Sequence, residues 1–187
     1  MCLSMLQPGP RSDMSRTRAS ARPVQESINI LAIFQLAPIR TCVSILVLLK
    51  YPPLTRSPGF WFFEARNNPT TAPLATWFNG GPGCSSMIGL FVENGPCQFV
   101  NGSSTPSNNT YSFNNFANML YIDQPIGTGF SYGTDDVSST VDAATEVWRL
   151  LQAFYAQFPQ YENRDLGIFT GMLSQDPFYG FLLIYNS

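Results

Sequence analysis

A glycine-rich loop is the first stretch of this 187-residue chain whose residue types point to chemistry. Asn79-Gly80-Gly81-Pro82-Gly83 directly follows the apolar run Pro73–Phe78, which is short enough to be a buried strand. Adjacent glycines let backbone N–H groups approach a ligand closely, and one such donor to an oxyanion is worth about 3–4 kcal/mol. The loop therefore predicts either an oxyanion or anion site, or only a tight structural turn.

A second pattern, Gly129-Phe130-Ser131-Tyr132-Gly133, matches the G-x-S-x-G turn that carries a nucleophilic serine in many hydrolases. That turn requires a strand that runs straight into the serine and a helix that begins straight after it, and here loops separate Ser131 from both. The sequence contains no histidine, which excludes a Ser-His-Asp set within these residues and any histidine-ligated metal site. We expect Ser131 to be a structural loop hydroxyl.

The composition indicates a folded domain with an acidic main part. Apolar residues make up 44% of the chain and charged residues only 12%. Residues 1–59 hold seven basic and two acidic side chains, and residues 60–187 hold three and ten, so net charges of +5 and −7 sum to −2. A nucleic-acid footprint on the acidic part is excluded, and the absence of a C-x-x-C pair argues against a zinc or redox site.

Apolar runs predict the elements that must position these residues. Strands are expected at Phe60–Ala65, Pro73–Phe78, Met119–Ile122 and Leu166–Thr170, Ser86–Phe91 is expected as a helical turn or strand, and Asn101–Asn115 as an exposed polar loop. This order of elements is typical of an α/β fold.

The clearest predicted helix is Ser138–Phe158. Ser139 with Asp142 three residues later is similar to a capping box, and Pro159 ends the helix. Apolar residues recur at spacings of three and four and predict one buried face: Val141, Ala144, Trp148, Leu151, Tyr155 and Phe158.

Residues 1–59 differ from the rest, and three alternatives stay open for them: a poorly ordered, non-functional or mispredicted segment, a degenerate signal or anchor, or an Arg/Ser-rich organelle presequence. Ile28–Leu49 has the length of a membrane span, but Pro38 and Arg40 lie at its centre, where a charge costs about 3 kcal/mol. A membrane span is therefore not expected, and the segment lacks a clean signal peptide.

Three motifs follow one another along the chain. They are Trp77-Phe78-Asn79-Gly80-Gly81-Pro82-Gly83-Cys84-Ser85-Ser86, Glu93-Asn94-Gly95-Pro96, and Tyr121-Ile122-Asp123-Gln124-Pro125-Ile126-Gly127-Thr128-Gly129-Phe130-Ser131-Tyr132. In this order the chain resembles the serine carboxypeptidases from about Phe60 to Thr170. The resemblance covers only the N-terminal part of a family member, well under half.

The resemblance implies an incomplete α/β-hydrolase fold, made of the N-terminal half of the mixed sheet with a flanking helix over residues 60–170. It implies a secreted or vacuolar serine-type hydrolase that removes C-terminal residues of peptides through a serine ester, without a metal or organic cofactor. By the same resemblance Gly81 supplies an oxyanion N–H, Asn79 and the N–H of Gly80 bind the substrate carboxylate, and Glu93 shares a proton with that carboxylate and a second glutamate.

The pattern breaks after the strand expected at Leu166–Thr170. Where the family has its nucleophile elbow, this chain has Gly171-Met172-Leu173-Ser174-Gln175-Asp176. The nucleophilic serine, the glutamate partner of Glu93 and the second oxyanion N–H are not found there, and the family's catalytic Asp and His are expected further on. We expect a truncated, catalytically inactive fragment in which residues 171–187 form a non-family tail, as a translated intron would produce.

Two pairs of residues are candidates for covalent modification. Cys84 resembles a family cysteine that bonds to a distant partner, while a Cys84–Cys97 bridge would close a short loop worth about 3 kcal/mol at most. Asn101 and Asn108 begin N-glycosylation sequons in the polar loop, and each is otherwise an unmodified turn residue.

Two alternatives to the inactive carboxypeptidase fragment stay open. The chain is either a non-catalytic remnant that binds peptide C-termini through Asn79, Gly80 and Glu93 or associates with other subunits, or a chain that does not fold stably. Its oligomeric state and side-chain preference are not set by the sequence.

Overall fold

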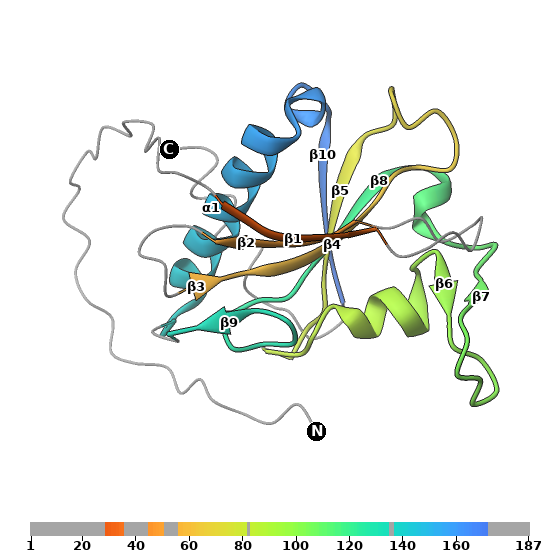
Figure 1. Ribbon diagram of the computed structural model, residues 1–187, viewed down its shortest axis with the longest axis horizontal. Coiled ribbons are helices and arrows are strands. Elements are labelled where there is room, and N and C mark those ends of the chain that lie inside the picture. The colour runs from red at the N-terminus through yellow and green to blue at the C-terminus, as the bar shows by residue number, and fades with distance from the viewer. Residues whose placement is uncertain (1–28, 36–44, 51–55, 82, 135–136, 172–187) are drawn as a thin grey trace.

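The computed structural model of the chain describes residues 29–35, 45–50, 56–81, 83–134 and 137–171 (Figure 1). Its main element is a mixed sheet with the strand order β1-β2-β4-β8-β5-β10. The bounds are Asn29–Gln35 for β1, Ile45–Lys50 for β2, Gly59–Phe63 for β4, Asn118–Ile122 for β8, Leu74–Phe78 for β5 and Leu166–Thr170 for β10. β1, β2, β4 and β8 are successively antiparallel, whereas β8, β5 and β10 are parallel.

Short elements surround this sheet. Two-residue strands form two small ladders, β3 (Arg56–Ser57) with β9 (Tyr132–Gly133) and β6 (Cys97–Gln98) with β7 (Ser107–Asn108). The helical elements are η1 (Gly89–Glu93, a π-helical turn), η2 (Phe113–Asn115), α1 (Thr140–Gln157) and η3 (Pro159–Tyr161). Together with the sheet they confirm the α/β architecture.

The four strands expected from apolar runs are present, displaced by at most two residues. β4, β5 and β8 are buried at all five positions, because both faces of the sheet are covered. Successive side chains point to opposite faces, so Phe60 and Phe62 pack on one side of β4 and Trp61 and Phe63 on the other. Ser86–Phe91, left open between helix and strand, is helical from Met87 onwards.

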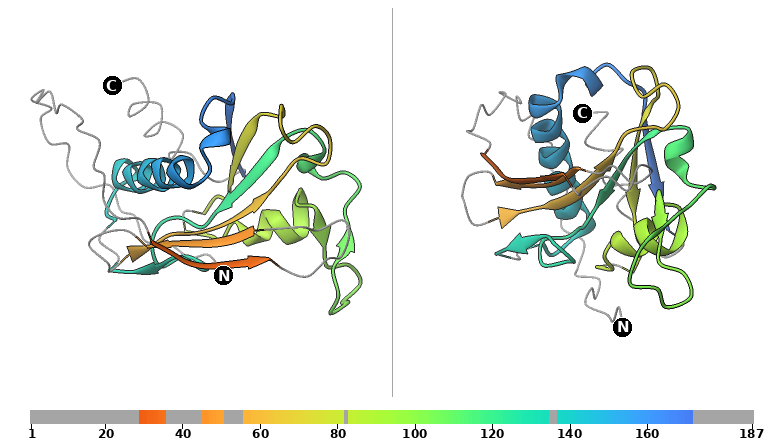
Figure 2. Two further views of the ribbon diagram at one scale, coloured as in Figure 1. Left: turned by 45° about the horizontal axis from the view of Figure 1, so that its top comes forward. Right: turned by 45° about the vertical axis from the view of Figure 1, so that its right-hand side comes forward.

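The sheet thus separates two hydrophobic clusters, and Figure 2 shows α1 on one face and the helical segment near residue 90 on the other. The first cluster joins strand residues such as Phe60 and Leu120 to Leu150 and Phe154 of α1. The second joins Trp61, Trp77 and Tyr121 to Leu90 of η1.

α1 begins as expected and covers most of its predicted apolar face. The Ser139 hydroxyl accepts a hydrogen bond from the Asp142 N–H at 3.2 Å, which caps the first turn. Of the six positions predicted to be covered, Ala144 and Leu151 are buried, and Trp148, Tyr155 and Phe158 are partly buried against the first cluster. Val141 is 52% exposed, so the prediction was wrong at that position alone. The buried positions also include Ala143, Val147, Leu150 and Phe154.

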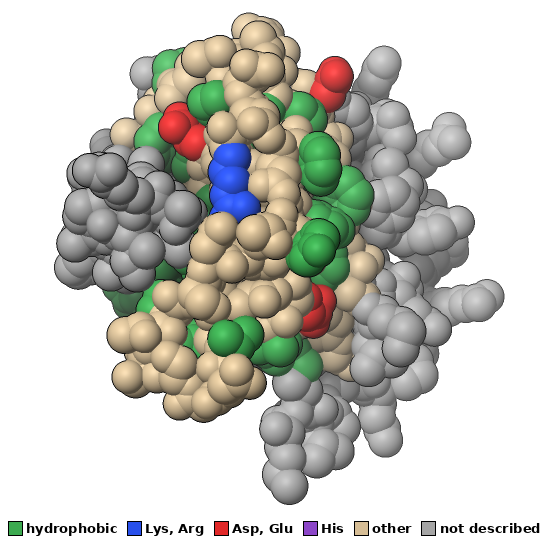
Figure 3. Space-filling model, turned by 90° about the vertical axis from the view of Figure 1, so that its right-hand side faces the viewer, with side chains coloured by type: hydrophobic (Ala, Val, Ile, Leu, Met, Phe, Trp, Pro, Cys, Tyr) green, Lys and Arg blue, Asp and Glu red, His purple; other side chains and the backbone are tan. Residues whose placement is uncertain are grey.

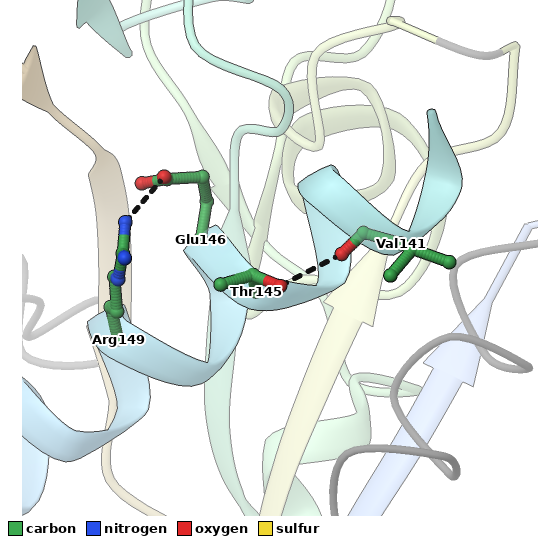
Figure 4. A network of polar contacts seen from close by, with 4 residues as sticks. All are labelled: Val141, Thr145, Glu146 and Arg149. Carbon is green, nitrogen blue, oxygen red and sulfur yellow. Dashed lines mark hydrogen bonds and ion pairs between the residues drawn. The ribbon is translucent and has the colours of Figure 1, made fainter. Parts of the chain in front are cut away.

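The middle of α1 carries a local polar network (Figure 4). Arg149 donates to the Glu146 carboxylate at 3.0 Å, and the Thr145 hydroxyl donates to the Val141 carbonyl at 2.9 Å. Glu146 is buried, so the pair with Arg149 offsets part of the cost of placing its carboxylate in the core.

Two further predictions concern residues 1–59 and the loop over Asn101–Asn115. The division of residues 1–59 from the rest stays a prediction, although two stretches of it, β1 and β2, form strands that extend the sheet beside β4. The loop over Asn101–Asn115 is exposed along most of its length, as predicted, but Asn109, Ser112 and Asn114 are buried. The chain beyond Gly171 lies outside the described residues.

Replacing Phe154 by Ala tests the α1 contact. The Phe154 ring is fully buried and lies 5.3 Å from the Phe62 ring and 5.8 Å from the Phe60 ring, centroid to centroid. We expect the free energy of unfolding, measured in urea, to fall by about 3–5 kcal/mol. Phe116→Ala is the matched control, because that ring is 77% exposed and its loss should change stability by at most about 0.5 kcal/mol. Equal effects of the two substitutions would contradict the packing.

Candidate functional site

The glycine-rich loop lies at the carboxyl ends of the parallel strands. Asn79 follows β5, Asp123 follows β8 and Gly171 follows β10. The three ends are adjacent because β5 pairs in parallel with both neighbours. Open α/β sheets bind ligands at this edge, so the chain places the glycine-rich loop where a site is expected.

Asn79 is held in one orientation by its side-chain oxygen. Asn79 Oδ1 accepts hydrogen bonds from Trp77 Nε1 and from the backbone N–H of Gly89, both at 2.9 Å. The Asn79 N–H donates to the Ser86 hydroxyl at 3.1 Å. With the oxygen occupied, Nδ2 has no hydrogen-bond partner among the described residues, and its two donors are available to an acceptor.

Gly81 allows the loop to turn sharply beside Cys84. Its φ of +141° belongs to a region that residues with a Cβ rarely adopt, and a Cβ there would lie 3.0 Å from the Cys84 nitrogen. The Cys84 N–H closes the turn on the Gly80 carbonyl at 3.3 Å. The end of β10 lies against the loop, because the Gly171 N–H donates to the Phe78 carbonyl at 2.8 Å. The N–H groups of Gly80 and Gly81 are thus carried by a constrained backbone.

Asp123 connects this loop to the one that follows β8. Its buried carboxylate accepts hydrogen bonds from the Ser85 hydroxyl at 2.7 Å, the Ser86 N–H at 2.8 Å and the Phe130 N–H at 2.9 Å. Burial raises the pKa of the Asp123 carboxyl, against the effect of these three donors. Sequence reasoning missed this role, although an acidic residue directly after a buried strand was a usable signal.

Ser131 is structural, as predicted. It is buried, its hydroxyl donates to the Asp123 carbonyl at 2.6 Å, and the same oxygen accepts the Gly59 N–H at 2.8 Å. Both capacities of the hydroxyl are used by backbone groups, so it is not poised to attack a substrate.

Glu93 is the last residue of η1, whose first residue, Gly89, binds the Asn79 side chain. The Glu93 side chain is exposed, and no hydrogen bond joins it to Asn79 among the described residues. Burial raises the pKa of Tyr121, and the negative charge of Glu93 raises it further. η1 therefore carries Glu93 and holds Asn79, and single-turn π-helices are frequent at functional sites.

Of the remaining candidates, Cys84 lies in the glycine-rich loop, and Cys97, Asn101 and Asn108 lie between η1 and β8. Cys84 and Cys97 are disulfide-bonded, whereas their pairing stays a prediction. Asn101 and Asn108, the two sequon asparagines, are exposed. Arg66 donates to Asn108 Oδ1 at 2.6 Å and to the Asn109 carbonyl at 2.8 Å, which ties this loop to the end of β4.

The face shown in Figure 3 bears a band of hydrophobic side chains with charged groups scattered around it. Exposed hydrophobic residues on the described part of the chain include Tyr111, Phe113, Phe116 and Phe169. The Phe113 ring lies 5.9 Å from the Trp77 ring and 6.1 Å from the Phe169 ring, centroid to centroid. The exposed Phe113 therefore lies between Phe169 and Trp77, and Trp77 is the residue that donates to Asn79.

The described residues provide neither a cluster of metal ligands nor a membrane-spanning helix. No group of three or more Cys, Asp or Glu side chains is placed there to hold a metal ion. No helix in those residues has the length and apolar character needed to cross a membrane.

The sheet order, the parallel strands and the glycine-rich loop at their carboxyl ends define part of an α/β-hydrolase fold. The family model described as serine carboxypeptidase matches residues 55–171, and the chain belongs to that family. It is 79% identical over 111 residues to carboxypeptidase S1 of Penicillium janthinellum, a match that covers 59% of this chain and 26% of the relative. It is also 49% identical over 109 residues to carboxypeptidase Y of Schizosaccharomyces pombe, covering 58% and 11%.

A solved structure shows the same fold. The crystal structure of Kex1Δp, a prohormone-processing carboxypeptidase from Saccharomyces cerevisiae, aligns with a TM-score of 0.63 and 30% identity, over 70% of this chain and 30% of that protein. This chain therefore spans only part of its relatives: its match to carboxypeptidase S1 covers about a quarter of that protein's length. These comparisons confirm the serine carboxypeptidase family and the α/β-hydrolase-type fold.

Removing the Asp123 carboxylate should loosen both loops. Asp123→Ala leaves the buried Ser86 N–H and the Phe130 N–H without their acceptor, and each such group costs about 1–3 kcal/mol. We expect the free energy of unfolding to fall by at least about 2 kcal/mol, measured by tryptophan fluorescence in urea.

Ser85→Ala is the control, because it removes only one of the three hydrogen bonds and should cost about 1 kcal/mol. A loss in Asp123→Ala no larger than that in Ser85→Ala would show that the carboxylate does not connect the loops.

Proposed function

We propose that the site recognises the C-terminal carboxylate of a peptide, and that the reaction it serves in the family is serine-type hydrolysis of the last peptide bond. The observation that carries the proposal is the orientation of Asn79: two donors hold its oxygen, and its amide nitrogen is left for an anionic acceptor. The relatives named as carboxypeptidases support the same substrate class.

The geometry suggests a role for each residue. Asn79 Nδ2 and the Gly80 N–H donate to the two oxygens of the peptide carboxylate, and hydrogen bonds to a charged group are worth about 1.5–3 kcal/mol each. Glu93 would contribute to binding by sharing a proton with the peptide carboxylate, since two facing carboxylates repel when both are ionised. Acid pH should therefore favour binding.

Gly81 would act in the chemical step. Attack on the scissile carbonyl places negative charge on its oxygen, and the Gly81 N–H, fixed by the turn at Cys84, would donate to that oxyanion. Acyl transfer also needs a serine nucleophile and a histidine that takes its proton and returns it to the leaving amine. These 187 residues contain no histidine, so we propose that they bind but do not hydrolyse.

A non-catalytic binding module is the second candidate. It is favoured by the fact that every contact that orients Asn79 comes from residues 77–89 and involves none of the missing catalytic groups. The alternative in which the chain associates with other subunits would use the exposed apolar surface at Phe113 and Phe169.

We also propose a secretory or vacuolar route for the protein. The disulfide-bonded state of Cys84 and Cys97 suits an oxidising compartment. The sequon residues Asn101 and Asn108 are exposed, so a glycan on either one would extend into solvent.

Carboxylate recognition can be tested with a substitution that keeps the shape of the site. Asn79→Asp retains an oxygen that accepts from Trp77 and Gly89, but it replaces the donor Nδ2 by a charged oxygen. We expect the affinity for a peptide with a free C-terminus, measured by calorimetry at acid pH, to fall by about tenfold or more.

Two controls accompany this measurement. Asn101→Asp makes the same chemical change on an exposed turn and should leave the affinity unchanged. The C-terminal amide of the same peptide should bind more weakly than the acid to the unmodified chain. Equal binding of acid and amide would rule out carboxylate recognition.

Hydrolysis can be tested on the same preparation. Loss of a catalytic triad costs about a factor of 10⁶ in turnover, so release of the C-terminal residue from a blocked dipeptide should not exceed that of a mock preparation. Saturable release that a serine-directed inhibitor abolishes would contradict the proposed inactivity.

A further inference from the structure

The chain contains three Asn-Gly pairs, at Asn79-Gly80, Asn94-Gly95 and Asn101-Gly102. In such a pair the deprotonated backbone nitrogen of glycine can attack the asparagine side-chain carbon. A new C–N bond forms, ammonia leaves with the side-chain nitrogen, and the resulting succinimide is opened by water to aspartate or isoaspartate. The reaction needs no oxidant, reductant or enzyme, and glycine favours it because it has no side chain to hinder the approach.

Two of the pairs are held by the fold. Asn79 Oδ1 is fixed by two hydrogen bonds, as described above. Asn94 is 7% exposed, its Oδ1 accepts from the Tyr121 hydroxyl at 2.9 Å, and the Gly95 N–H donates to the Gly89 carbonyl at 3.3 Å. In both pairs the side chain must break hydrogen bonds before its carbon can meet the glycine nitrogen.

The third pair lacks these side-chain restraints. Asn101 and Gly102 occupy the middle of a turn closed by the Ser103 N–H and the Val100 carbonyl at 3.0 Å. Both are exposed, both have positive φ, and a Cβ built on Gly102 would meet nothing within 4 Å. Among the described residues, neither the Asn101 amide nor the Gly102 N–H makes a hydrogen bond.

We propose that Asn101 is a site of spontaneous deamidation through a succinimide, and that the fold protects the chemically equivalent pairs at Asn79 and Asn94. The product adds a negative charge to the loop and destroys the sequon at Asn101. A glycan would be attached to the same nitrogen that leaves as ammonia, so glycosylation and deamidation exclude each other at this residue. The proposal does not depend on carboxylate recognition, although deamidation at Asn79 would create the charge that opposes it.

The test uses the unglycosylated chain from a bacterial host, incubated at mildly alkaline pH and then reduced and digested with pepsin in acid. Cleavage after Phe78, Phe91, Phe99 and Tyr111 places the three asparagines in three different peptides. Mass spectrometry then follows the replacement of NH₂ by OH in each peptide over time. Native chain should convert Asn101 at least about tenfold faster than Asn79 or Asn94, because each hydrogen bond that must open lowers the reactive population by roughly that factor.

A parallel incubation in urea separates the effect of the fold from that of the sequence. There the three rates should converge, since all three pairs share the same two residue types. Gly102→Ala should slow conversion at Asn101 alone, and Tyr121→Phe should accelerate it at Asn94 alone. Equal rates in the native chain, or a lead of Asn101 that persists unchanged in urea, would overturn the proposal.

Discussion

The arrangement of the site depends on one buried carboxylate. Asp123 lies at the end of β8, and its three hydrogen bonds reach a hydroxyl and an N–H of the segment before η1 and the N–H of Phe130. A buried charge is tolerated only when its oxygens are supplied with donors, so both loops must stay close to the sheet edge. The position of η1, and with it the N–H of Gly89 that fixes Asn79, follows from this constraint.

Asparagine serves two purposes in this structure, and hydrogen bonding distinguishes them. Asn118 uses both ends of its amide: its oxygen accepts the Ala65 N–H, and its nitrogen donates to the carbonyls of Pro69 and Ala72. It supplies hydrogen bonds to the backbone where β4 ends and β8 begins. The Asn79 side chain uses only its oxygen, and its nitrogen has no hydrogen-bond partner among the described residues. The first pattern is structural, and the second is what a binding residue requires.

The strands and the glycine-rich loop could be predicted from sequence because short apolar runs bounded by turn residues leave few alternatives. The start of α1 at Ser139 was also readable, since its cap depends on residues three apart. The apolar spacing also identified most of the buried face of α1, but it did not show which valine is covered, because Val141 and Val147 are equally apolar and only the sheet decides between them. The burial of Asn109 and Asn114 and the role of Asp123 were missed for the same reason, because each depends on partners distant in sequence.

Recognition and chemistry are separable within this fold. The groups that orient Asn79 and shape the turn at Gly81 all lie between Trp77 and Phe130, and each is satisfied by neighbours from the same stretch. The orientation of the Asn79 side chain therefore depends on no histidine, whereas transfer of a proton to a leaving amine does.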